Sequence, residues 1–458
     1  MVRTYISDTP NSVDQTVLIK GWVQNKRDMG QIAFMDVRDR TGLLQVVLGD
    51  DIDHPKLGPE YVVEIEGKVV KRGERYINKK LVTGEVELQV QRIEVISESL
   101  EPPFEVRKDS SVVGEDVRLK YRYMDIRTER MKNNLELRHK VTKFIRDYYD
   151  EQRFIEVETP SLTKGTPEGA REFLVPSRQH EGNFYVLPQS PQQFKQLLMV
   201  GGIDRYFQIV KCYRDEDQRG DRQPEFTQLD VEMSFVDQED VLQMTEEMLI
   251  KLVETVAPEK TISQVPFPRI TYAESMEKYG NDKPDLRKNK KDDNELAFVW
   301  VTDFPMYEKT EDKEMQAMHH PFTSPNPEDL DKLESDPYSV RSVAYDVALN
   351  GYEIGGGSIR ITDPELQQRI FKVLGMNEEE IEAKFGHMID AFKYGVPPHG
   401  GLAFGLDRLI MILAGEPNIR EVIAFPKTGD ARDPMMDAPG PIEEKRLKDA
   451  HIKLDLNS

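Results

Sequence analysis

The sequence predicts an α+β protein in which a small N-terminal β-barrel precedes a larger domain, built on a mainly antiparallel sheet flanked by helices. Three observations lead to this prediction. Short alternating strands crowd the first hundred residues, helical periodicity begins only after a linker, and the later strands follow one another as hairpins. At 458 residues the chain is also too long for one ordinary core.

The composition is that of a soluble globular protein, with 38% apolar and 32% charged residues. No apolar run approaches the length of a membrane span, and no signal or transit peptide is recognisable, so we expect no membrane association. The single cysteine, Cys212, excludes an intrachain disulfide and a cysteine metal cluster and favours a cytoplasmic location. The net charge of -21 falls mostly outside the first hundred residues, which carry only -2, so this part repels nucleic acid least.

The N-terminal barrel is predicted from five strands bounded by Gly, Asp or Pro turns, at 16–23, 31–39, 43–48, 61–72 and 85–96. Val86, Leu88 and Val90 alternate with polar residues, so one face of the last strand is buried. Five short strands in about eighty residues suit a closed barrel of the oligonucleotide-binding (OB) type. We assign this domain to 1–100 and a polar, proline-containing linker to 101–125.

The larger domain, 126–458, begins with a helical pattern after Met131 and a strand that Pro160 ends. The segment 282–297 is rich in charge and poor in apolar residues, which is typical of a surface bridge. Further strands are predicted near 184–188, 206–213, 225–235, 298–304, 342–349 and 352–361, and helices near 238–256, 366–373, 377–393 and from Leu406.

Known phosphate-binding and hydrolase motifs are missing from the chain. It has no GxxxxGK[ST], no GxGxxG after a strand, no GxSxG and no HExxH. Any nucleotide chemistry must therefore use another scaffold.

The stretch "CYRDEDQRGDR" concentrates arginines beside a predicted core strand. Guanidinium groups bind phosphate and carboxylate bidentately, so Arg214, Arg219 and Arg222 could neutralise a triphosphate without a P-loop. The alternative is a salt-bridged hairpin tip, because Asp215, Asp217 and Asp221 lie between the arginines.

A second candidate is "YDVALNGYEIGGGSIR", in which a turn at 350–351 separates Asp346 from Glu353. Two carboxylates brought together in this way could hold Mg²⁺ that also contacts phosphate. The triple glycine 355–357 leaves room for a flat ligand against the backbone; a hairpin with a bulge is the alternative.

Three further stretches are weaker candidates. Arg408 lies in the first turn of an apolar helix and needs a partner, which Asp407 could supply. Glu168 lies in a Gly- and Pro-containing loop, where a lone acid is usually solvated. His319 and His320 are adjacent and point in different directions, so a zinc site is not predicted.

On the barrel, basic residues surround an aromatic residue. Exposed aromatic rings stack on unpaired bases while flanking cations hold phosphates, and Arg27, Phe34 and Gln45 fit such a surface. The alternative is that Phe34 belongs to the core.

The order of these stretches along one chain resembles a known family. The strand ending at Pro160, the "CYRDEDQRGDRQPEFTQLD" hairpin and "GLAFGLDR" resemble the three motifs of class II aminoacyl-tRNA synthetases. The stretches "DRQPEFTQLDVEMSF", "MHHPFTSP", "GYEIGGGSIRI" and "REVIAFPKT" are similar to the bacterial-type aspartyl members, nearly over the whole chain. The resemblance implies an enzyme that activates L-aspartate with ATP and transfers it to the 3′ end of tRNA-Asp. It leaves open whether tRNA-Asn is also charged.

For ATP, the resemblance implies that Arg214, Glu353 and Arg408 are the catalytic residues, with Arg214 bridging the α-phosphate and the substrate α-carboxylate. Glu216 would accept a hydrogen bond from adenine, which Phe226 and Arg408 would sandwich. Arg222 and Arg408 would hold the γ-phosphate, and Asp346 and Glu353 would hold Mg²⁺. The implied ATP-binding set is Arg214, Asp215, Glu216, Arg222, Gln223, Phe226, Glu353, Gly405, Leu406, Asp407 and Arg408.

For aspartate, the resemblance implies that Arg360 grips the side-chain carboxylate with Lys195 beside it, and that these cations lack partners and so reject a neutral amide. Glu168, Ser190 and Gln192 would contact the ammonium. The implied set is Glu168, Ser190, Gln192, Lys195, Arg214, Gln228, Asp230, His319 and Arg360, with His320 also near the substrate.

One departure from the family and two partners complete the expectations. Bacterial relatives usually carry an extra domain where this chain has the bridge 282–297. The barrel residues at the family's anticodon-reading positions are Arg27, Phe34, Gln45 and Glu87, and the motif ending at Pro160 implies a homodimer.

Three alternatives stay open from the sequence. An asparaginyl- or lysyl-tRNA synthetase is disfavoured by Arg360 with Lys195. A non-catalytic nucleic-acid-binding relative is disfavoured because Arg214, Glu216, Glu353 and Arg408 are retained together. An amino-acid ligase that does not use tRNA would not need the barrel.

Overall fold

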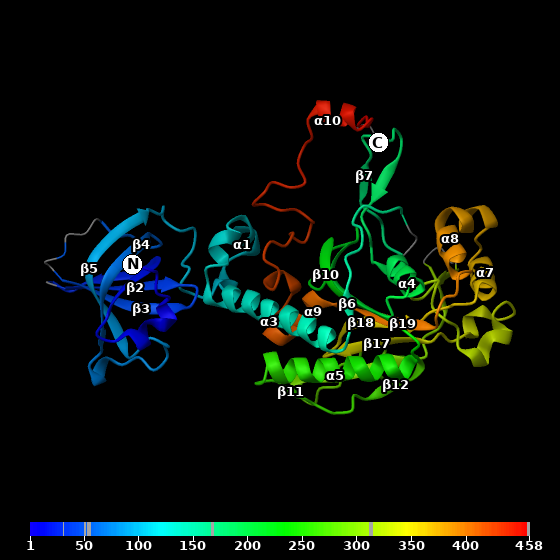
Figure 1. The fold of residues 1–458 in the computed structure, drawn as a ribbon, viewed down its shortest axis with the longest axis horizontal. Coiled ribbons are helices and arrows are strands. Elements are labelled where there is room, and N and C mark those ends of the chain that lie inside the picture. Colours follow the sequence, from blue (N-terminus) through cyan, green and yellow to red (C-terminus); the bar gives the residue numbers. More distant parts are fainter. Residues whose placement is uncertain (31, 50–51, 53–55, 166–168, 311–314, 456–458) are drawn as a thin grey trace. The chain divides into compact units, whose positions relative to one another are not determined.

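The computed structural model describes the chain except residues 31, 50–51, 53–55, 166–168, 311–314 and 456–458. The chain divides into two compact units, Met1–Asn133 and Asn134–Ser458 (Figure 1). The predicted linker 101–125 therefore lies inside the first unit. The boundaries at 100 and 125 stay predictions.

The first unit contains the predicted closed five-stranded barrel, with strand order β1-β2-β3-β5-β4. Its interior is filled by the alternate residues of each strand, and Val46 and Leu88, which face each other across the parallel β3–β5 pair, are fully buried. The strands are β1 (Thr16–Asp28), β2 (Ile32–Asp39), β3 (Gly42–Gly49), β4 (Val62–Lys71) and β5 (Val86–Ser97).

A buried carboxylate ties the end of the first unit to the barrel. Glu60 accepts hydrogen bonds from Arg38 at 2.7 and 2.5 Å and from Arg127 at 2.9 Å. The Arg127 guanidinium also lies 5.4 Å from the ring centroid of Trp22, a cation–π contact. These contacts explain why the first unit extends beyond the strands of the barrel.

The second unit is built on an eight-stranded sheet of order β12-β14-β17-β18-β19-β10-β9-β6. The outermost pairs, β12–β14 and β6–β9, are parallel and the pairs between them are antiparallel, which confirms the predicted mainly antiparallel sheet. The strands are β6 (Ile155–Glu156), β9 (Arg205–Tyr213), β10 (Glu225–Ser234), β12 (Arg269–Thr271), β14 (Phe298–Thr302), β17 (Ala344–Leu349), β18 (Tyr352–Ile359) and β19 (His399–Gly405).

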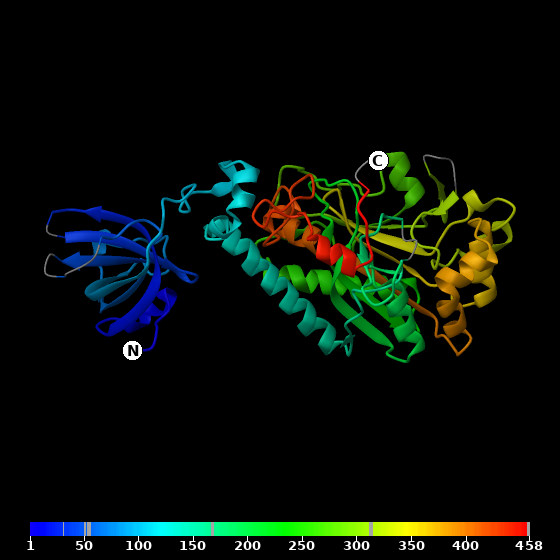
Figure 2. The same ribbon diagram turned by 90° about the horizontal axis from the view of Figure 1, so that it is seen from above.

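Helices α3 (Glu129–Glu151), α5 (Gln238–Val256) and α9 (Leu406–Ala414) lie beside the sheet (Figures 1 and 2). Their apolar side chains form one large core with it. The other described helices are α1 (Glu115–Lys120), α2 (Arg122–Asp125), α4 (Gln192–Val200), α6 (Tyr272–Tyr279), α7 (Pro364–Val373), α8 (Glu378–Phe392) and α10 (Glu444–Asp449). Short strands outside the main sheet are β7 (Leu174–Pro176), β8 (Phe184–Val186), β11 (Thr261–Ile262), β13 (Glu295–Leu296), β15 (Tyr307–Lys309) and β16 (Met315–Ala317).

Strand β10 shows how the sheet separates core from site. Leu229 and Val231 join the core under the helices. Gln228 and Asp230, which alternate with them, line a pocket on the opposite side. The period of two along a strand therefore places apolar residues on one face of the sheet and polar residues on the other.

Two local predictions were wrong. The strand that was expected to end at Pro160 is only the two residues of β6. Helix α4 was missed; it buries the polar residues Gln192, Lys195 and Gln196 on one side, and Leu197 and Val200 pack against a separate apolar cluster.

Candidate active site

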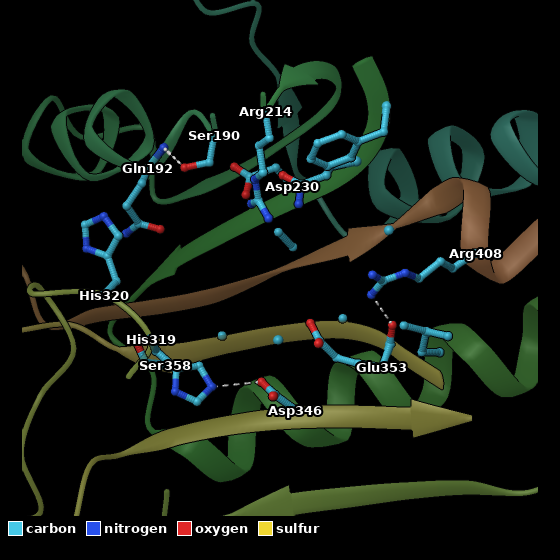
Figure 3. A pocket seen from close by; sticks show the side chains of 18 of the residues that line it. Ser190, Gln192, Arg214, Asp230, His319, His320, Asp346, Glu353, Ser358 and Arg408 are labelled. Carbon is cyan, nitrogen blue, oxygen red and sulfur yellow. Dashed lines mark hydrogen bonds and ion pairs between the residues drawn. The ribbon is translucent and has the colours of Figure 1, made fainter. Parts of the chain in front are cut away.

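A cavity of about 440 Å³ lies on the polar face of the sheet. It brings together Arg214, Arg360 and Arg408, which are far apart in the sequence. Figure 3 shows Arg214 and Arg408 at this cavity. From the predicted sets the lining also includes Ser190, Gln192, Lys195, Glu216, Arg222, Gln223, Phe226, Gln228, Asp230, His319, His320, Asp346, Glu353, Gly405 and Asp407.

A few predicted residues lie elsewhere. Asp215 is exposed and its backbone N–H and C=O bond to Arg171, and Leu406 is fully buried in the core; neither lines the cavity. Glu168 lies outside the residues that the structure describes. The four barrel residues belong to the other unit.

At one end of the cavity, called here the amino-acid end, four charged side chains form a closed network. Lys195 Nζ lies 2.7 Å from Asp230 Oδ1 and 3.2 Å from Glu232 Oε2. Arg360 donates to both oxygens of Glu232, from Nε at 3.0 Å and Nη2 at 3.1 Å, and from Nη1 to Ser358 Oγ at 2.6 Å. Two cations and two carboxylates therefore balance in a nearly solvent-free place.

This network corrects one expectation. Arg360 and Lys195 were predicted to lack partners, but Glu232 and Asp230 pair with them, since a buried charge is stable only when paired. Burial raises the pKa of Asp230. Burial also opposes ionisation of Glu232, but Arg360 and Lys195 outweigh it and lower its pKa to about 2. Glu232 was missed, although it follows Gln228 and Asp230 at the strand period of two.

The two histidines differ in environment. His319 Nε2 lies 3.1 Å from Asp346 Oδ1; burial opposes its protonation, but Asp346 raises its pKa (Figure 3). Burial and the positive charge of Arg360 lower the pKa of His320 to about 3. Within the described residues no group of three or more His, Cys, Asp or Glu could hold a metal ion by itself.

At the other end, the nucleotide end, arginines are held by acids of the loop 214–223. Arg408 donates from Nη2 to Asp221 Oδ2 at 3.2 Å, from Nε to the Asp221 carbonyl at 3.3 Å and from Nη1 to the Glu353 carbonyl at 2.8 Å. Arg222 Nη1 lies 3.1 Å from Glu216 Oε2. Asp221 was not predicted as a site residue.

Asp407 does not pair with Arg408, which was the alternative left open by the sequence. Asp407 instead accepts from Arg138 Nη1 at 2.5 Å and from the Thr227 backbone N–H at 2.8 Å. It therefore links α3, β10 and α9 beneath the pocket, and leaves Arg408 directed into the cavity.

Phe226 and Gln223, which both line the cavity, make different contacts with the rest of the protein. The Arg214 guanidinium lies 5.1 Å from the Phe226 ring centroid, which holds that arginine over the ring. Gln223 uses its amide on the backbone of Lys427, at 3.1 and 2.7 Å. Its side chain therefore secures the C-terminal segment to the loop 214–223.

The predicted hairpin carrying Asp346 and Glu353 is present as β17–β18. Asn350 and Gly351 have φ of 53° and 88°, the positive values that a two-residue hairpin turn requires. A Cβ at Gly356 would lie 2.2 Å from Asp346 Oδ1, so only glycine lets that carboxylate lie across the strand. The Glu353 side chain is exposed to the open cavity, but partial desolvation by the surrounding protein and then the neighbouring Asp346 raise its pKa.

The charged bridge 282–297 is attached to this hairpin. The Asn350 side chain accepts from the Ala297 N–H and donates to the Glu295 carbonyl, both at 2.9 Å. Asp285 pairs bidentately with Arg287 at 3.1 and 2.9 Å, and Asp282 lines the cavity. The bridge therefore contributes a pocket residue that its composition did not indicate.

On the barrel, the predicted residues lie on one outward face. Arg27 on β1 is opposite Phe34 on β2, and Gln45 lies on β3, next to β2 in the sheet. Phe34 is partly exposed, whereas its neighbours Ala33 and Met35 are buried, so the core alternative for Phe34 is wrong. Glu87 on β5 pairs with Arg72 at 3.5 Å.

Family comparison agrees with this architecture. Residues 114–429 match the family described as tRNA synthetases class II (D, K and N), and residues 17–96 match an OB-fold nucleic acid binding domain. The first match covers more than half of the chain. The helices in the described part of the chain are too short or too polar to cross a bilayer.

Individual relatives narrow the class of synthetase to which the chain can belong. The chain is 42% identical to the aspartate–tRNA ligase of Staphylococcus haemolyticus, covering 97% of this chain and 98% of that protein, and 43% identical to the aspartate–tRNA(Asp/Asn) ligase of Thermoanaerobacter pseudethanolicus, covering 98% and 97%. The chain therefore belongs to the aspartate–tRNA ligase family of class II synthetases, which confirms the predicted fold and enzyme class. The alignments extend over 578 and 579 positions against 458 residues here, so these relatives contain residues without a counterpart in this chain.

Solved structures show the same fold. An aspartyl-tRNA synthetase from Leishmania major matches with a TM-score of 0.75 at 23% identity, covering 93% of this chain and 94% of that one. An asparaginyl-tRNA synthetase from Pyrococcus horikoshii, complexed with asparaginyl-adenylate, matches with a TM-score of 0.75 at 22% identity, covering 93% and 98%.

Proposed function

We propose that the chain activates L-aspartate with ATP and transfers it from the adenylate to the 3′ end of tRNA-Asp. The observation that carries this proposal is the convergence of Arg214, Arg360 and Arg408 in one cavity. Together they offset the charge of a triphosphate and a dicarboxylate. Because no protein nucleophile is needed, catalysis consists of positioning and electrostatic stabilisation.

For ATP, Arg214 lies at the junction of the two ends, where it would stabilise charge as the aspartate carboxylate attacks the α-phosphate. Adenine would stack on Phe226, and Arg222 and Arg408 would bind the γ-phosphate. In the present arrangement Asp221 and Glu216 hold these two arginines. ATP would therefore displace Asp221 from Arg408.

Asp346 and Glu353 fit a Mg²⁺ ion that takes its other ligands from phosphate and water. The raised pKa of Glu353 reflects its partial desolvation in the cavity and the nearby Asp346, whose repulsion a cation would relieve. The ion would supply charge neutralisation at the phosphates.

For aspartate, Arg360 and Lys195 would bind the side-chain carboxylate while Glu232 and Asp230 hold them in place. Ser190 and Gln192 would contact the ammonium, with Glu168 as a further proposed contact. An asparagine side chain would turn its amide N–H groups toward the donors of Arg360 and Lys195, where an aspartate carboxylate offers only acceptors, which costs binding energy.

The barrel would bind the anticodon through Arg27, Phe34, Gln45 and Glu87, with stacking on Phe34 and a phosphate contact from Arg27. The small negative charge of the first hundred residues supports this role. Whether tRNA-Asn is also charged is the finer question, since one relative is a ligase for both tRNAs.

A homodimer is proposed for the catalytic unit. Large apolar side chains are exposed along the β6 edge and the β7–β8 hairpin: Ile155, Leu162, Leu174, Phe184 and Tyr185. An open sheet edge with exposed apolar residues invites pairing with a second copy. Light scattering at micromolar concentration tests this, and a monomer would contradict it.

A cytoplasmic location is proposed on the single, buried cysteine, which suits a reducing compartment. Cell fractionation tests this location, and recovery of the protein outside the cytoplasm would contradict it.

The central experiment is a set of charging reactions with tRNA-Asp and tRNA-Asn, each with aspartate and with asparagine. We expect aspartyl-tRNA-Asp as the main product, preceded by aspartate-dependent ATP–pyrophosphate exchange. Charging with asparagine, or exchange without aspartate, would overturn the proposal. Aspartyl-tRNA-Asn would extend it to both tRNAs.

A further inference from the structure

Behind the amino-acid end of the cavity, three buried polar side chains form a hydrogen-bonded row. Gln192 Nε2 donates to Gln196 Oε1 at 3.1 Å, and Gln196 Nε2 lies 3.2 Å from His399 Nε2. His399 Nδ1 lies 2.8 Å from the carbonyl oxygen of Pro397. Gln196 and His399 are fully buried, and only Gln192 reaches the cavity.

The direction of this row follows from its fixed end. A carbonyl oxygen can only accept, so His399 Nδ1 must carry a proton and donate to Pro397. In a neutral ring Nε2 is then an acceptor, which fixes Gln196 with its amide nitrogen toward His399 and its oxygen toward Gln192. Gln192 must therefore present its own nitrogen to Gln196.

The neutral state of His399 is consistent with its surroundings. Burial lowers its pKa; Glu232 on β10 opposes this, whereas Arg360 and Lys195 add to it. A second proton on Nε2 would face the Gln196 nitrogen and reverse the row.

At the cavity, this row of hydrogen bonds determines which end of the Gln192 amide faces the pocket. With its nitrogen engaged, Gln192 directs Oε1 toward the open centre of the pocket (Figure 3). An amide oxygen accepts hydrogen bonds and attracts a cation, whereas a rotated amide would offer N–H groups and repel it.

We propose that Gln196 and His399 are positioning residues that hold the Gln192 carbonyl toward the substrate ammonium. The inference rests on the proposed binding of aspartate in this pocket. It explains why α4 buries polar residues where a helix normally buries apolar ones. It also predicts that Gln196 and His399 affect the binding of the substrate ammonium and not the binding of its two carboxylates.

The test compares aspartate with succinate, which has both carboxylates but no ammonium. Gln196→Met removes the acceptor for Gln192, and we expect the KM for aspartate to rise about tenfold while the inhibition constant of succinate and the KM for ATP stay within twofold. Gln196→Glu keeps an acceptor toward Gln192 and should stay within about threefold of the unsubstituted protein. Gln193→Met, at a buried position on the same helix, is the matched control and should leave all three constants unchanged.

Two results would overturn the inference: an unchanged aspartate KM in Gln196→Met, or an equal weakening of aspartate and succinate. Gln192→Met separates this failure from failure of the proposed function. If Gln192→Met leaves the aspartate KM unchanged, aspartate does not bind here and the proposed site is wrong; if it raises KM while Gln196→Met does not, only the positioning role is wrong.

If Gln196→Met does not fold, His399→Met and His399→Gln on β19 answer the same question. His399→Gln retains a side-chain acceptor for Gln196 and His399→Met does not. We expect only His399→Met to weaken aspartate relative to succinate. Equal behaviour of the two variants would overturn the inference.

Discussion

At the amino-acid end of the pocket Arg360 and Lys195 have side chains only 4% and 2% exposed, whereas Arg222 and Arg408 at the nucleotide end are 44% and 22% exposed. The first pair is bound by two carboxylates on a core strand, and the second by acids of a surface loop. Buried ion pairs in a rigid sheet hold their geometry, while partly exposed pairs exchange partners at little cost. One end is thus preorganised, and the other is free to open for the triphosphate proposed to bind there.

The largest expected effect comes from the buried end. Glu232→Gln leaves Arg360 and Lys195 with one full carboxylate between them, and we expect the free energy of unfolding to fall by about 3–5 kcal/mol. Chemical denaturation of the catalytic unit measures this. The control is Glu247→Gln, which breaks an exposed pair with Lys251 and should cost about 0.5 kcal/mol or less. Equal losses of unfolding free energy in Glu232→Gln and Glu247→Gln would contradict the distinction between buried and exposed ion pairs.

Arg214, which lies between the ends, should matter for rate and little for stability. Arg214→Ala removes the cation proposed to stabilise the developing charge, so kcat in ATP–pyrophosphate exchange should fall about 100- to 1000-fold. Arg219→Ala, at an exposed position of the same loop, should retain nearly full activity. A loss of less than tenfold in Arg214→Ala would argue against its catalytic role.

Acid should remove the contribution of Glu232 to the free energy of unfolding. Its pKa in the folded protein is about 2, below the ordinary 4.5, so its contribution is complete above pH 4.5 and is lost as the pH falls toward 2. The difference in unfolding free energy between the unsubstituted protein and Glu232→Gln should therefore shrink between pH 5 and pH 3. A constant difference would show that the lost stability is not electrostatic.

The smallest effect is expected at Asp221. Asp221→Asn releases Arg408 from a partly exposed pair, and the KM for ATP should fall by about two- to fivefold with the KM for aspartate unchanged. Asp217→Asn, on the same loop but outside the cavity lining, is the control. A rise in the ATP KM would mean that Asp221 assists nucleotide binding instead of competing with it.

Local chemistry made much of the molecule predictable. Alternation along 16–96 predicted four of the five barrel strands to within one residue at each end, because one buried face imposes a period of two; β1 continues to Asp28, beyond its predicted end at 23. Asn350-Gly351 predicted the hairpin that carries Asp346 and Glu353, because both positions require positive φ. The motifs also indicated most residues that line the cavity.

What the sequence did not indicate was the pairing of charges. Glu232, Asp221 and Asp282 look like ordinary acids in their local contexts, and Gln196 and His399 are separated by 203 positions. The sequence alone therefore determined most of the elements, the class of enzyme and the residue types of the site. Only the tertiary structure decided which cation meets which carboxylate, because electrostatic and hydrogen-bond partners are set by distances of a few ångströms between segments remote in the chain.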